Sequence, residues 1–149
     1  MCERETGTPF SMNMICDNEK CEPTRGYPTD AGLDLKCAND VVITKGGSAE
    51  IHTGVRFEIP EGYYGKLESK SGLNFKHSIV CLGGVIDSSY RGEIIVKLYN
   101  FGDKDVILSK GSKCVQIIFM KHYNPILTKI EQFAEDTDRG ENGFGSTGK

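Results

Sequence analysis

Short segments of alternating apolar and polar residues are the sequence feature that most constrains the fold of this chain. Apolar side chains recur at about every second position from Val55 to Ile59, and Pro60 and Gly62 end the run. This period places alternate side chains on opposite faces of a β-strand. The other runs of this kind cover residues 41–43, 63–67, 79–82, 93–99, 106–108 and 114–123. Many short strands joined by turn-forming residues predict an all-β sandwich, barrel or jelly roll, with at most one helical turn near residues 71–76.

Length and charge limit the number of domains and the kinds of partner that this chain can have. The chain has 149 residues, which suits one compact domain, and we place this domain at residues 1–135. The chain has 18 basic and 21 acidic residues, which gives a net charge of −3. It therefore has no overall positive field that would hold a nucleic-acid backbone. No apolar run approaches the roughly 18 residues that cross a membrane. We therefore expect neither direct nucleic-acid binding nor membrane insertion.

Six cysteines raise the question of disulfides or zinc. The first residues are polar and charged, without an apolar signal segment, which favours reduced thiols in a cytoplasmic or nuclear protein. The closest pair, Cys16 and Cys21, lacks the C-x-x-C spacing of a zinc site. We expect no structural zinc.

The last fourteen residues, 136–149, differ in composition from the rest, with four glycines and one large apolar group, Phe144. Such a segment buries too little apolar area to offset its ordering entropy, which predicts an arm that is mobile without ligand. Residues 143–149 resemble a phosphate loop, but that loop needs a buried strand before it and a helix after it. The glycine amides, Arg139 and the hydroxyls of Ser146 and Thr147 still suit an anion. A flexible tail without a ligand is the alternative.

Two polar segments interrupt the strand pattern. Lys70-Ser71-Gly72-Leu73-Asn74 places a cation, a hydroxyl and free amides together, which suits an oxyanion, although a plain Ser-Gly turn has the same composition. Residues 83–92 are predicted to form a hairpin that carries Asp87 close to Tyr90. Asp87 is either a general base that activates water or a turn-capping residue.

Two polar residues stand inside apolar runs. Asp34 lies between Leu33 and Leu35, so its carboxylate either faces solvent or helps to hold a hydrated metal. Gln116 lies within the run 114–120 and needs hydrogen-bond partners if buried, unless its strand is an exposed edge. The three histidines are far apart in sequence and are interpreted as structural or surface groups.

In this order, five segments resemble the motifs of the trimeric dUTPase family. They are A-G-L-D-L at 31–35, K-S-G-L-N at 70–74, G-V-I-D-S-S-Y-R-G-E at 84–93, K-G-S-K-C-V-Q-I-I-F at 110–119 and R-G-E-N-G-F-G-S-T-G at 139–148. The resemblance implies a distorted jelly-roll barrel, a homotrimer with active sites shared between subunits, and Mg²⁺-dependent hydrolysis of dUTP to dUMP and pyrophosphate. It also implies a part in limiting uracil incorporation into DNA and in supplying dUMP for dTMP synthesis.

The same resemblance implies a role for each motif residue. Asp87 would orient the attacking water, Tyr90 would pack on the deoxyribose, and Asp34 would support hydrated magnesium. The implied uracil contacts are the backbone groups of Gly83, Gly84, Val85 and Ile86. The implied phosphate contacts are Lys70, Ser71, Gly72 and Gln116. The arm would close over the nucleotide through Arg139, Phe144, Gly145, Ser146 and Thr147.

Two positions depart from the family pattern, and two other functions stay open. Lys70 stands where arginine is usual and offers a point charge without a bidentate fork; Asn142 stands where glycine is more usual. A dCTP deaminase would share the fold, but its chemistry needs a general acid/base such as glutamate beside the pyrimidine, and residues 83–90 contain none. A non-catalytic module that binds a protein partner is the second alternative.

Overall fold

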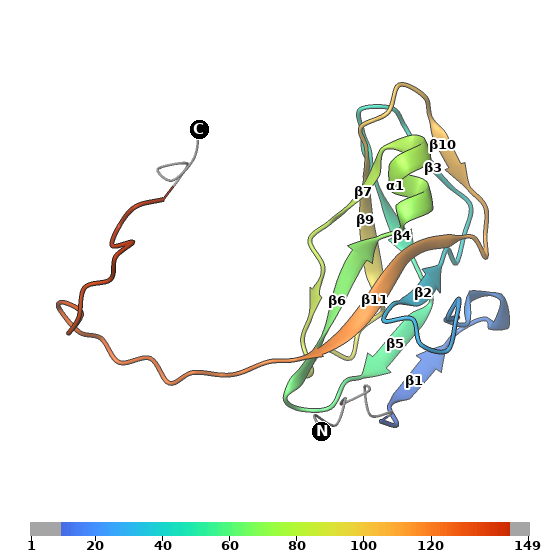
Figure 1. The fold of residues 1–149 in the computed structure, drawn as a ribbon. Coiled ribbons are helices and arrows are strands. Elements are labelled where there is room, and N and C mark those ends of the chain that lie inside the picture. The colour runs from blue at the N-terminus through green and yellow to red at the C-terminus, as the bar shows by residue number, and fades with distance from the viewer. Residues whose placement is uncertain (1–9, 144–149) are drawn as a thin grey trace.

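The computed structural model describes residues 10–143 and shows a barrel of short strands from which the C-terminal segment departs (Figure 1). The strands are β1 (Asn13–Cys16), β2 (Leu33–Lys36), β3 (Val41–Ile43), β4 (Ser48–His52), β5 (Val55–Glu58), β6 (Tyr63–Ser69), β7 (Ile79–Leu82), β8 (Val85–Ile86), β9 (Ile95–Asn100), β10 (Val106–Leu108) and β11 (Lys113–Lys121). The helical elements are the 3₁₀ turn η1 (Glu19–Cys21) and helix α1 (Ser71–His77).

These strands pair across long stretches of sequence. Within the described residues they form sheets of order β2-β11-β6-β8 and β4-β9-β7 and the two-stranded sheets β1-β5 and β10-β3. Every pairing is antiparallel. The long strand β11 lies between β2 and β6, and a bulge between Lys113 and Val115 shifts its register on β2. This bulge leaves Cys114 as the extra residue of β11.

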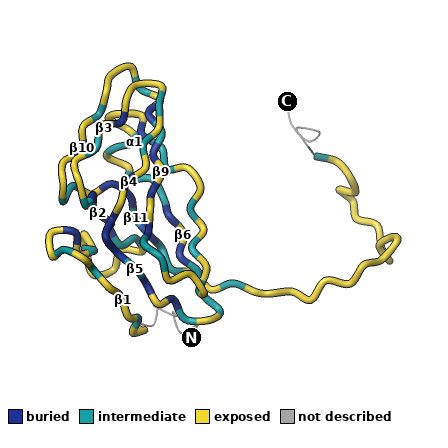
Figure 2. The backbone as a smooth tube through the Cα atoms, turned by 180° about the vertical axis from the view of Figure 1, so that it is seen from behind, coloured by how far each residue is buried: buried dark blue, intermediate teal, exposed yellow. Residues whose placement is uncertain are grey.

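The interior follows from the alternation of side chains along each strand. In β9 the buried residues Val96, Leu98 and Asn100 alternate with more exposed neighbours. Inward side chains of the strands join in one apolar cluster that contains Leu35, Ile43, Ile51, Phe57, Leu67 and Ile117 among others. Figure 2 shows this dark, buried interior within the barrel and the exposed chain outside it. The predicted all-β jelly-roll fold is confirmed.

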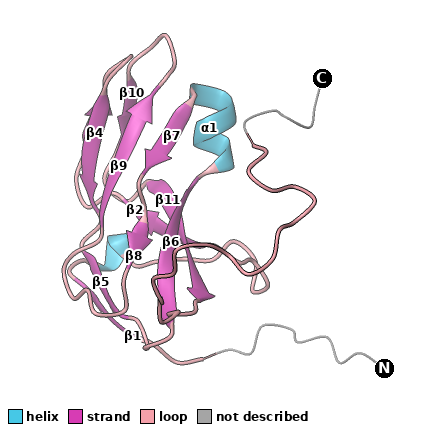
Figure 3. Ribbon diagram, turned by 90° about the vertical axis from the view of Figure 1, so that its left-hand side faces the viewer, coloured by secondary structure: helices cyan, strands magenta, loops and turns pink. Residues whose placement is uncertain are grey.

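Residues 83–92 lie in the long connection of a hairpin, because β7 before them pairs antiparallel with β9 after them and Leu82 is opposite Lys97. The connection is more than a simple turn: Val85 and Ile86 pair with Lys66 and Gly65 of β6, so β8 joins the other sheet (Figure 3). Residues 87–92 connect the sheets as a loop.

Beyond β11 the chain leaves the barrel as an extended segment without regular helix or strand through residue 143 (Figures 1 and 3). Large apolar side chains on it are exposed, notably Tyr123 at 95%, Ile126 at 96% and Phe133 at 85%. The division at residue 136 and the mobility of the arm stay predictions. No helix among the described residues has the length and apolar character to cross a membrane.

Candidate active site

Three predicted site residues meet where β2, β11 and β6 lie side by side. Gln116 on β11 is opposite Asp34 on β2 and Glu68 on β6, and Lys70 follows the end of β6. These side chains line an open, largely polar pocket of about 370 Å³. Its walls are Gly26, Asp30, Ala31, Gly32, Asp34, Lys70, Lys113, Gln116 and Ile118.

Asp34 is the electrostatic centre of this pocket. Only 5% of it is exposed, and its Oδ1 accepts a hydrogen bond from the Lys70 ammonium while Lys113 Nζ lies 2.9 Å from Oδ2. Burial raises the pKa of Asp34, but the hydrogen bonds and charges of Lys70 and Lys113 outweigh burial and hold the pKa below its ordinary value. Asp34 is therefore a buried carboxylate paired with two cations, and the interpretation that it faces solvent is wrong.

Gln116 lies in a central strand, which excludes the exposed-edge interpretation. Its Nε2 donates to the Ser69 carbonyl at 3.1 Å, and its side chain lies over Gly32. A Cβ at position 32 would be 2.9 Å from Gln116 Cδ, so any larger residue would displace the amide. The glycine of the first motif thus makes room for the glutamine of the fourth.

Ser71 and Gly72 begin α1 directly after Lys70, and both are exposed beside the same pocket. A Cβ at Gly72 would meet no atom within 4 Å, so the described chain leaves open space above this residue. Lys70 is extended backbone at the N-cap, and Asn74 N donates to its carbonyl at 2.9 Å. The turn places an exposed hydroxyl and a bare backbone directly after Lys70, which lines the pocket.

The predicted uracil-binding residues form a second group along the other edge of the sheet. Leu67 N donates to the Gly84 carbonyl at 2.8 Å, which fixes the segment against β6. Gly84 has φ of +128°, and a Cβ there would lie 2.9 Å from Leu67 Cβ. Only glycine fits this close approach. Gly83 is also in the left-handed region, at φ +73°, while Val85 is exposed and Ile86 packs on the core.

Asp87 and Tyr90 follow this group in an exposed turn. Tyr90 N donates to the Asp87 carbonyl at 3.1 Å, and the Tyr90 hydroxyl donates to the Glu93 carbonyl at 2.9 Å. The Asp87 carboxylate is exposed, so water reaches it directly. The turn therefore joins the backbones of the predicted base and of the predicted sugar-packing residue.

Asp87 and Lys70 lie at opposite ends of β6 within one chain, and Gly84 lies against Leu67 between them. Because Ile86 pairs with Gly65, Asp87 lies beside the start of β6, whereas Lys70 follows its end. With a rise of about 3.3 Å per residue, these ends are about 20 Å apart. Arg139 lies on the departing segment, where its Nε donates to the Asn142 carbonyl at 3.0 Å. Phe144, Gly145, Ser146 and Thr147 lie outside the described residues.

Sequence reasoning missed two residues at these places. Lys113 pairs with Asp34 because the β11 bulge brings it there, and no local pattern signals a bulge. Glu93 was treated as part of a strand, yet its carboxylate accepts from Gly54 N and contacts His52, each at 2.8 Å. The only sequence signal for Glu93 is that a charged residue stands directly before the apolar run 94–96.

The described residues contain no cluster of three or more His, Cys, Asp or Glu side chains that could enclose a metal. The pocket nevertheless holds Asp34 and Asp30 among polar walls. Mg²⁺ usually keeps several waters and binds through one or two carboxylates together with substrate phosphates. The donor set fits a hydrated magnesium ion that enters with a polyphosphate.

Comparisons with known proteins agree with this barrel fold. The family model for dUTPase matches residues 18–148. The deoxyuridine 5'-triphosphate nucleotidohydrolase of Paramecium bursaria Chlorella virus 1 is 41% identical over 126 residues, covering 85% of this chain and 89% of the viral one.

Solved structures of phage proteins resemble the fold as well. The Staphylococcus bacteriophage 80alpha dUTPase with dUPNHPP superposes with a TM-score of 0.85 at 28% identity, covering 93% of this chain and 99% of that one. A mutant dUTPase from phage phi11 of S. aureus, described with a structural Mg(II) ion, has a TM-score of 0.77 at 27% identity over 83% of this chain and 99% of that one. The fold is that of a class of nucleotide hydrolases built on a jelly roll. The chain belongs to the dUTPase family.

Proposed function

We propose that this protein hydrolyses dUTP to dUMP and pyrophosphate. The observation that carries the proposal is the meeting of the family motifs at 31–35, 70–74 and 110–119 around one polar pocket with two ammonium groups. A triphosphate is the kind of ligand that such cations and a nearby hydroxyl bind. The related viral enzyme's name and the dUPNHPP complex of the phage protein support deoxyuridine triphosphate as the substrate.

Each residue of the candidate site has a role in hydrolysis that follows from its chemistry. Lys70, Ser71, Gly72 and Gln116 hold the phosphate chain. Asp87 orients the attacking water and accepts its proton as the water attacks the α-phosphorus. Magnesium, when bound beside Asp34 through water, neutralises charge on the phosphates. Pyrophosphate is the leaving group.

The base and sugar are recognised by the segment that runs beside β6 from Leu67 towards the start of the strand. The backbone of Gly83, Gly84, Val85 and Ile86 offers amides and carbonyls to the polar edge of uracil, and the pairing of β8 with β6 keeps this backbone in place. The ring of Tyr90 packs against the deoxyribose and leaves no space for a 2′-hydroxyl. The arm, through Arg139 and residues 144–147, closes over the nucleotide and excludes water.

We also propose a homotrimer whose active sites are shared between subunits. The Asp87 and Lys70 groups are about 20 Å apart along one chain by strand geometry, so neither end alone completes the site. Another copy can supply the missing group. The exposed Tyr123, Ile126 and Phe133 on the departing segment support an assembly in which this segment packs on a neighbour. In the cell, the enzyme would act in the cytoplasm or nucleus, limiting uracil in DNA and supplying dUMP.

A panel of nucleotides with and without magnesium tests the proposal by pyrophosphate release. We expect turnover of dUTP with magnesium and little of dTTP, dCTP or UTP. Asp87→Asn should keep dUTP binding and lower turnover by about two orders of magnitude or more, because an amide does not accept the water's proton. Asp103→Asn, at an exposed turn, is the matched control. Formation of dUTP from dCTP, followed by chromatography, would instead identify a deaminase, and absence of any turnover would indicate a binding module.

A further inference from the structure

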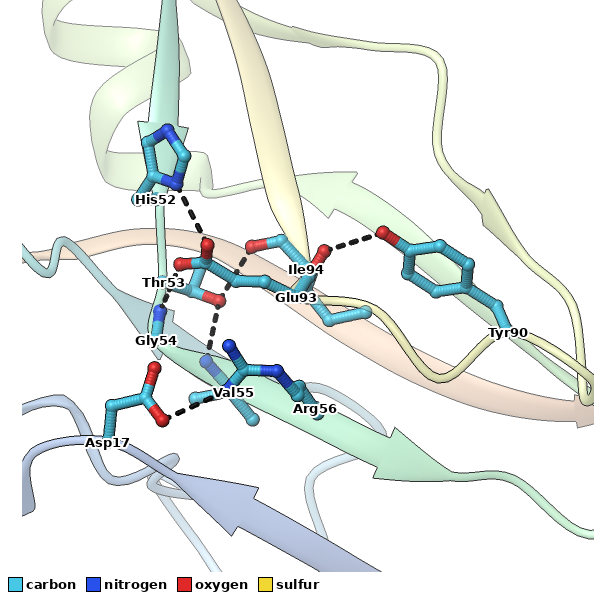
Figure 4. Close-up of polar contacts among 9 residues, drawn as sticks. All are labelled: Asp17, His52, Thr53, Gly54, Val55, Arg56, Tyr90, Glu93 and Ile94. Atoms are coloured by element: carbon cyan, nitrogen blue, oxygen red, sulfur yellow. Dashed lines mark hydrogen bonds and ion pairs between the residues drawn. The ribbon is translucent and has the colours of Figure 1, made fainter.

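The ring of Tyr90 is held through Glu93, whose side chain is in turn bound by the turn between β4 and β5, about forty residues earlier in the chain (Figure 4). The Tyr90 hydroxyl donates to the main-chain carbonyl of Glu93 at 2.9 Å. The ring lies over Gly92, where a Cβ would be 2.9 Å from Tyr90 Cε2 and closer still to the hydroxyl end. Ring orientation therefore depends on where the backbone of residues 92 and 93 is fixed.

Glu93 is the residue that fixes this backbone. Its Oε1 accepts from Gly54 N at 2.8 Å, and its Oε2 is 2.8 Å from His52 Nδ1. Gly54 has φ of +68°, which directs its amide at the carboxylate, and its carbonyl accepts from Asp17 N at 2.9 Å. The Glu93 carboxylate thus connects the end of the loop 87–92 to His52 and Gly54 in the β4–β5 turn. This turn is itself hydrogen-bonded to the segment before η1 through Asp17 N.

The next residue is anchored as firmly. Ile94 N donates to the Val55 carbonyl at 2.8 Å, and the buried Thr53 hydroxyl donates to the Ile94 carbonyl at 2.7 Å. The side before Glu93, residues 87–92, is a largely exposed loop. Glu93 is therefore the first firmly anchored residue after this loop, and its carbonyl is the acceptor that Tyr90 uses.

The electrostatic surroundings favour a charged Glu93. Burial raises the pKa of this carboxyl, but hydrogen bonds from His52 and the Gly54 amide, with the nearby charge of Arg56, lower it below the ordinary value overall. Arg56 is itself paired with Asp17 at 2.8 Å. Since Glu93 side-chain exposure is 21%, its contacts are only partly screened by water.

We propose that Glu93 is a positioning residue for sugar selection, which acts with Gly92 by holding the Tyr90 ring at a fixed place against the deoxyribose. The proposal rests on the proposed role of Tyr90 in excluding the 2′-hydroxyl. A ring that is tethered at its hydroxyl and supported by a bare glycine backbone cannot swing aside to admit a ribonucleotide. The selectivity for a deoxy sugar is then set jointly by the loop and by the turn at residues 52–54.

The test compares kcat/KM for dUTP and UTP in the full-length enzyme. Glu93→Ala, Tyr90→Phe and Gly92→Ala should each lower the dUTP/UTP ratio by roughly fivefold or more, since each frees or displaces the ring. Glu93→Gln keeps an oxygen for Gly54 N and should retain most of the ratio. Glu50→Ala removes a carboxylate from the same β4-β9 pair, far from Tyr90 in register, and should leave the ratio unchanged.

A double variant separates positioning from general loss of stability. Glu93→Ala and Tyr90→Phe break the same tether, so together they should lower the ratio no further than the stronger single change. A fall in melting temperature with an unchanged ratio in Glu93→Ala would overturn the proposal. If Glu93→Ala does not fold, Tyr90→Phe and Gly92→Ala decide, and a wild-type ratio in both overturns it.

Tyr90→Ala distinguishes failure of this proposal from failure of the proposed function. If Tyr90→Ala admits UTP while the tether variants keep the wild-type ratio, Tyr90 selects the sugar but Glu93 does not position it. If Tyr90→Ala also keeps the wild-type ratio, the proposed role of Tyr90 is itself wrong and the inference fails with it.

Discussion

Replacement of Asp34 by asparagine tests the charge arrangement in the phosphate pocket. Asp34 is buried, and both of its oxygens face ammonium groups, those of Lys70 and Lys113. The substituted side chain would keep the volume but lose the charge, and its amide nitrogen would point at one of the cations. The variant should therefore lose stability, and it should bind hydrated magnesium less well.

The size of the loss follows from burial. Removing one partner of a fully buried ion pair costs about 3–5 kcal/mol, whereas an exposed pair contributes under about 1 kcal/mol. The lysine side chains are 26% and 47% exposed and can turn toward water once the carboxylate is gone. An intermediate loss of about 2 kcal/mol in the free energy of unfolding is expected for Asp34→Asn at neutral pH.

The dependence on pH gives the sharper test. The folded pKa of Asp34 is lowered, so its contribution to stability is complete above the unfolded pKa and is lost as pH falls through the folded pKa. The difference between wild type and Asp34→Asn should be constant above about pH 5 and shrink below the unfolded pKa of about 3.9. All other titrating groups are common to both proteins, so their contributions cancel in the stability difference.

Urea unfolding followed by circular dichroism measures this difference, since the chain has no tryptophan to report by fluorescence. Protein concentration must be equal in all samples because assembly contributes to apparent stability. Glu50→Gln, in the exposed pair with Lys97 at 4.0 Å, should change stability by less than about 0.5 kcal/mol. Equal stability of Asp34→Asn and wild type at pH 7, or an undiminished difference at a pH well below the folded pKa, would refute the pairing.

Three further predictions use the same residues and the arm. Lys70→Arg should fold and lower the KM for dUTP modestly, since a guanidinium bonds Asp34 and a phosphate oxygen together; a large loss of activity in steady-state assays would contradict this. Gly84→Ala should lower the free energy of unfolding by about 1–3 kcal/mol and raise KM, because its Cβ would press on Leu67; unchanged melting and KM would contradict this. Removal of residues 136–149 should spare assembly and abolish turnover, and hydrogen exchange should show protection of the arm by a non-hydrolysable dUTP analogue more than by dUMP; full activity of the truncated chain would exclude a lid.

The strands were predictable because their signal is local. The bounds of β3, β7 and β10 match the runs 41–43, 79–82 and 106–108, where alternating burial acts on each residue independently of its partner. Helix α1 was expected as one turn at 71–76 and extends through His77, with Ser78 closing it in the left-handed region at φ +55°. These features need no knowledge of the rest of the chain.

Pairing partners were not predictable, because they depend on contacts between distant segments. Residues 83–92 lie in the connection of the β7–β9 hairpin, yet Val85 and Ile86 within it also pair with the distant strand β6. The bulge at Cys114 likewise arises from the fit of β11 onto β2, and it delivers Lys113 to Asp34. Both features lie at the candidate site, and departures from regular strand pairing are concentrated near functional sites in proteins.

The glycines of the motifs show what the sequence alone does not reveal about how the candidate site is built. Glycine in a motif first suggests a turn, yet Gly32 and Gly92 are absent from the residues with positive φ. Each instead lies under a side chain of proposed function, Gly32 under Gln116 and Gly92 under Tyr90. A methyl group at either position would displace that side chain without disturbing the strand pattern. Substitution there should therefore change catalysis and selectivity more than stability, which is the opposite of what a turn glycine would show.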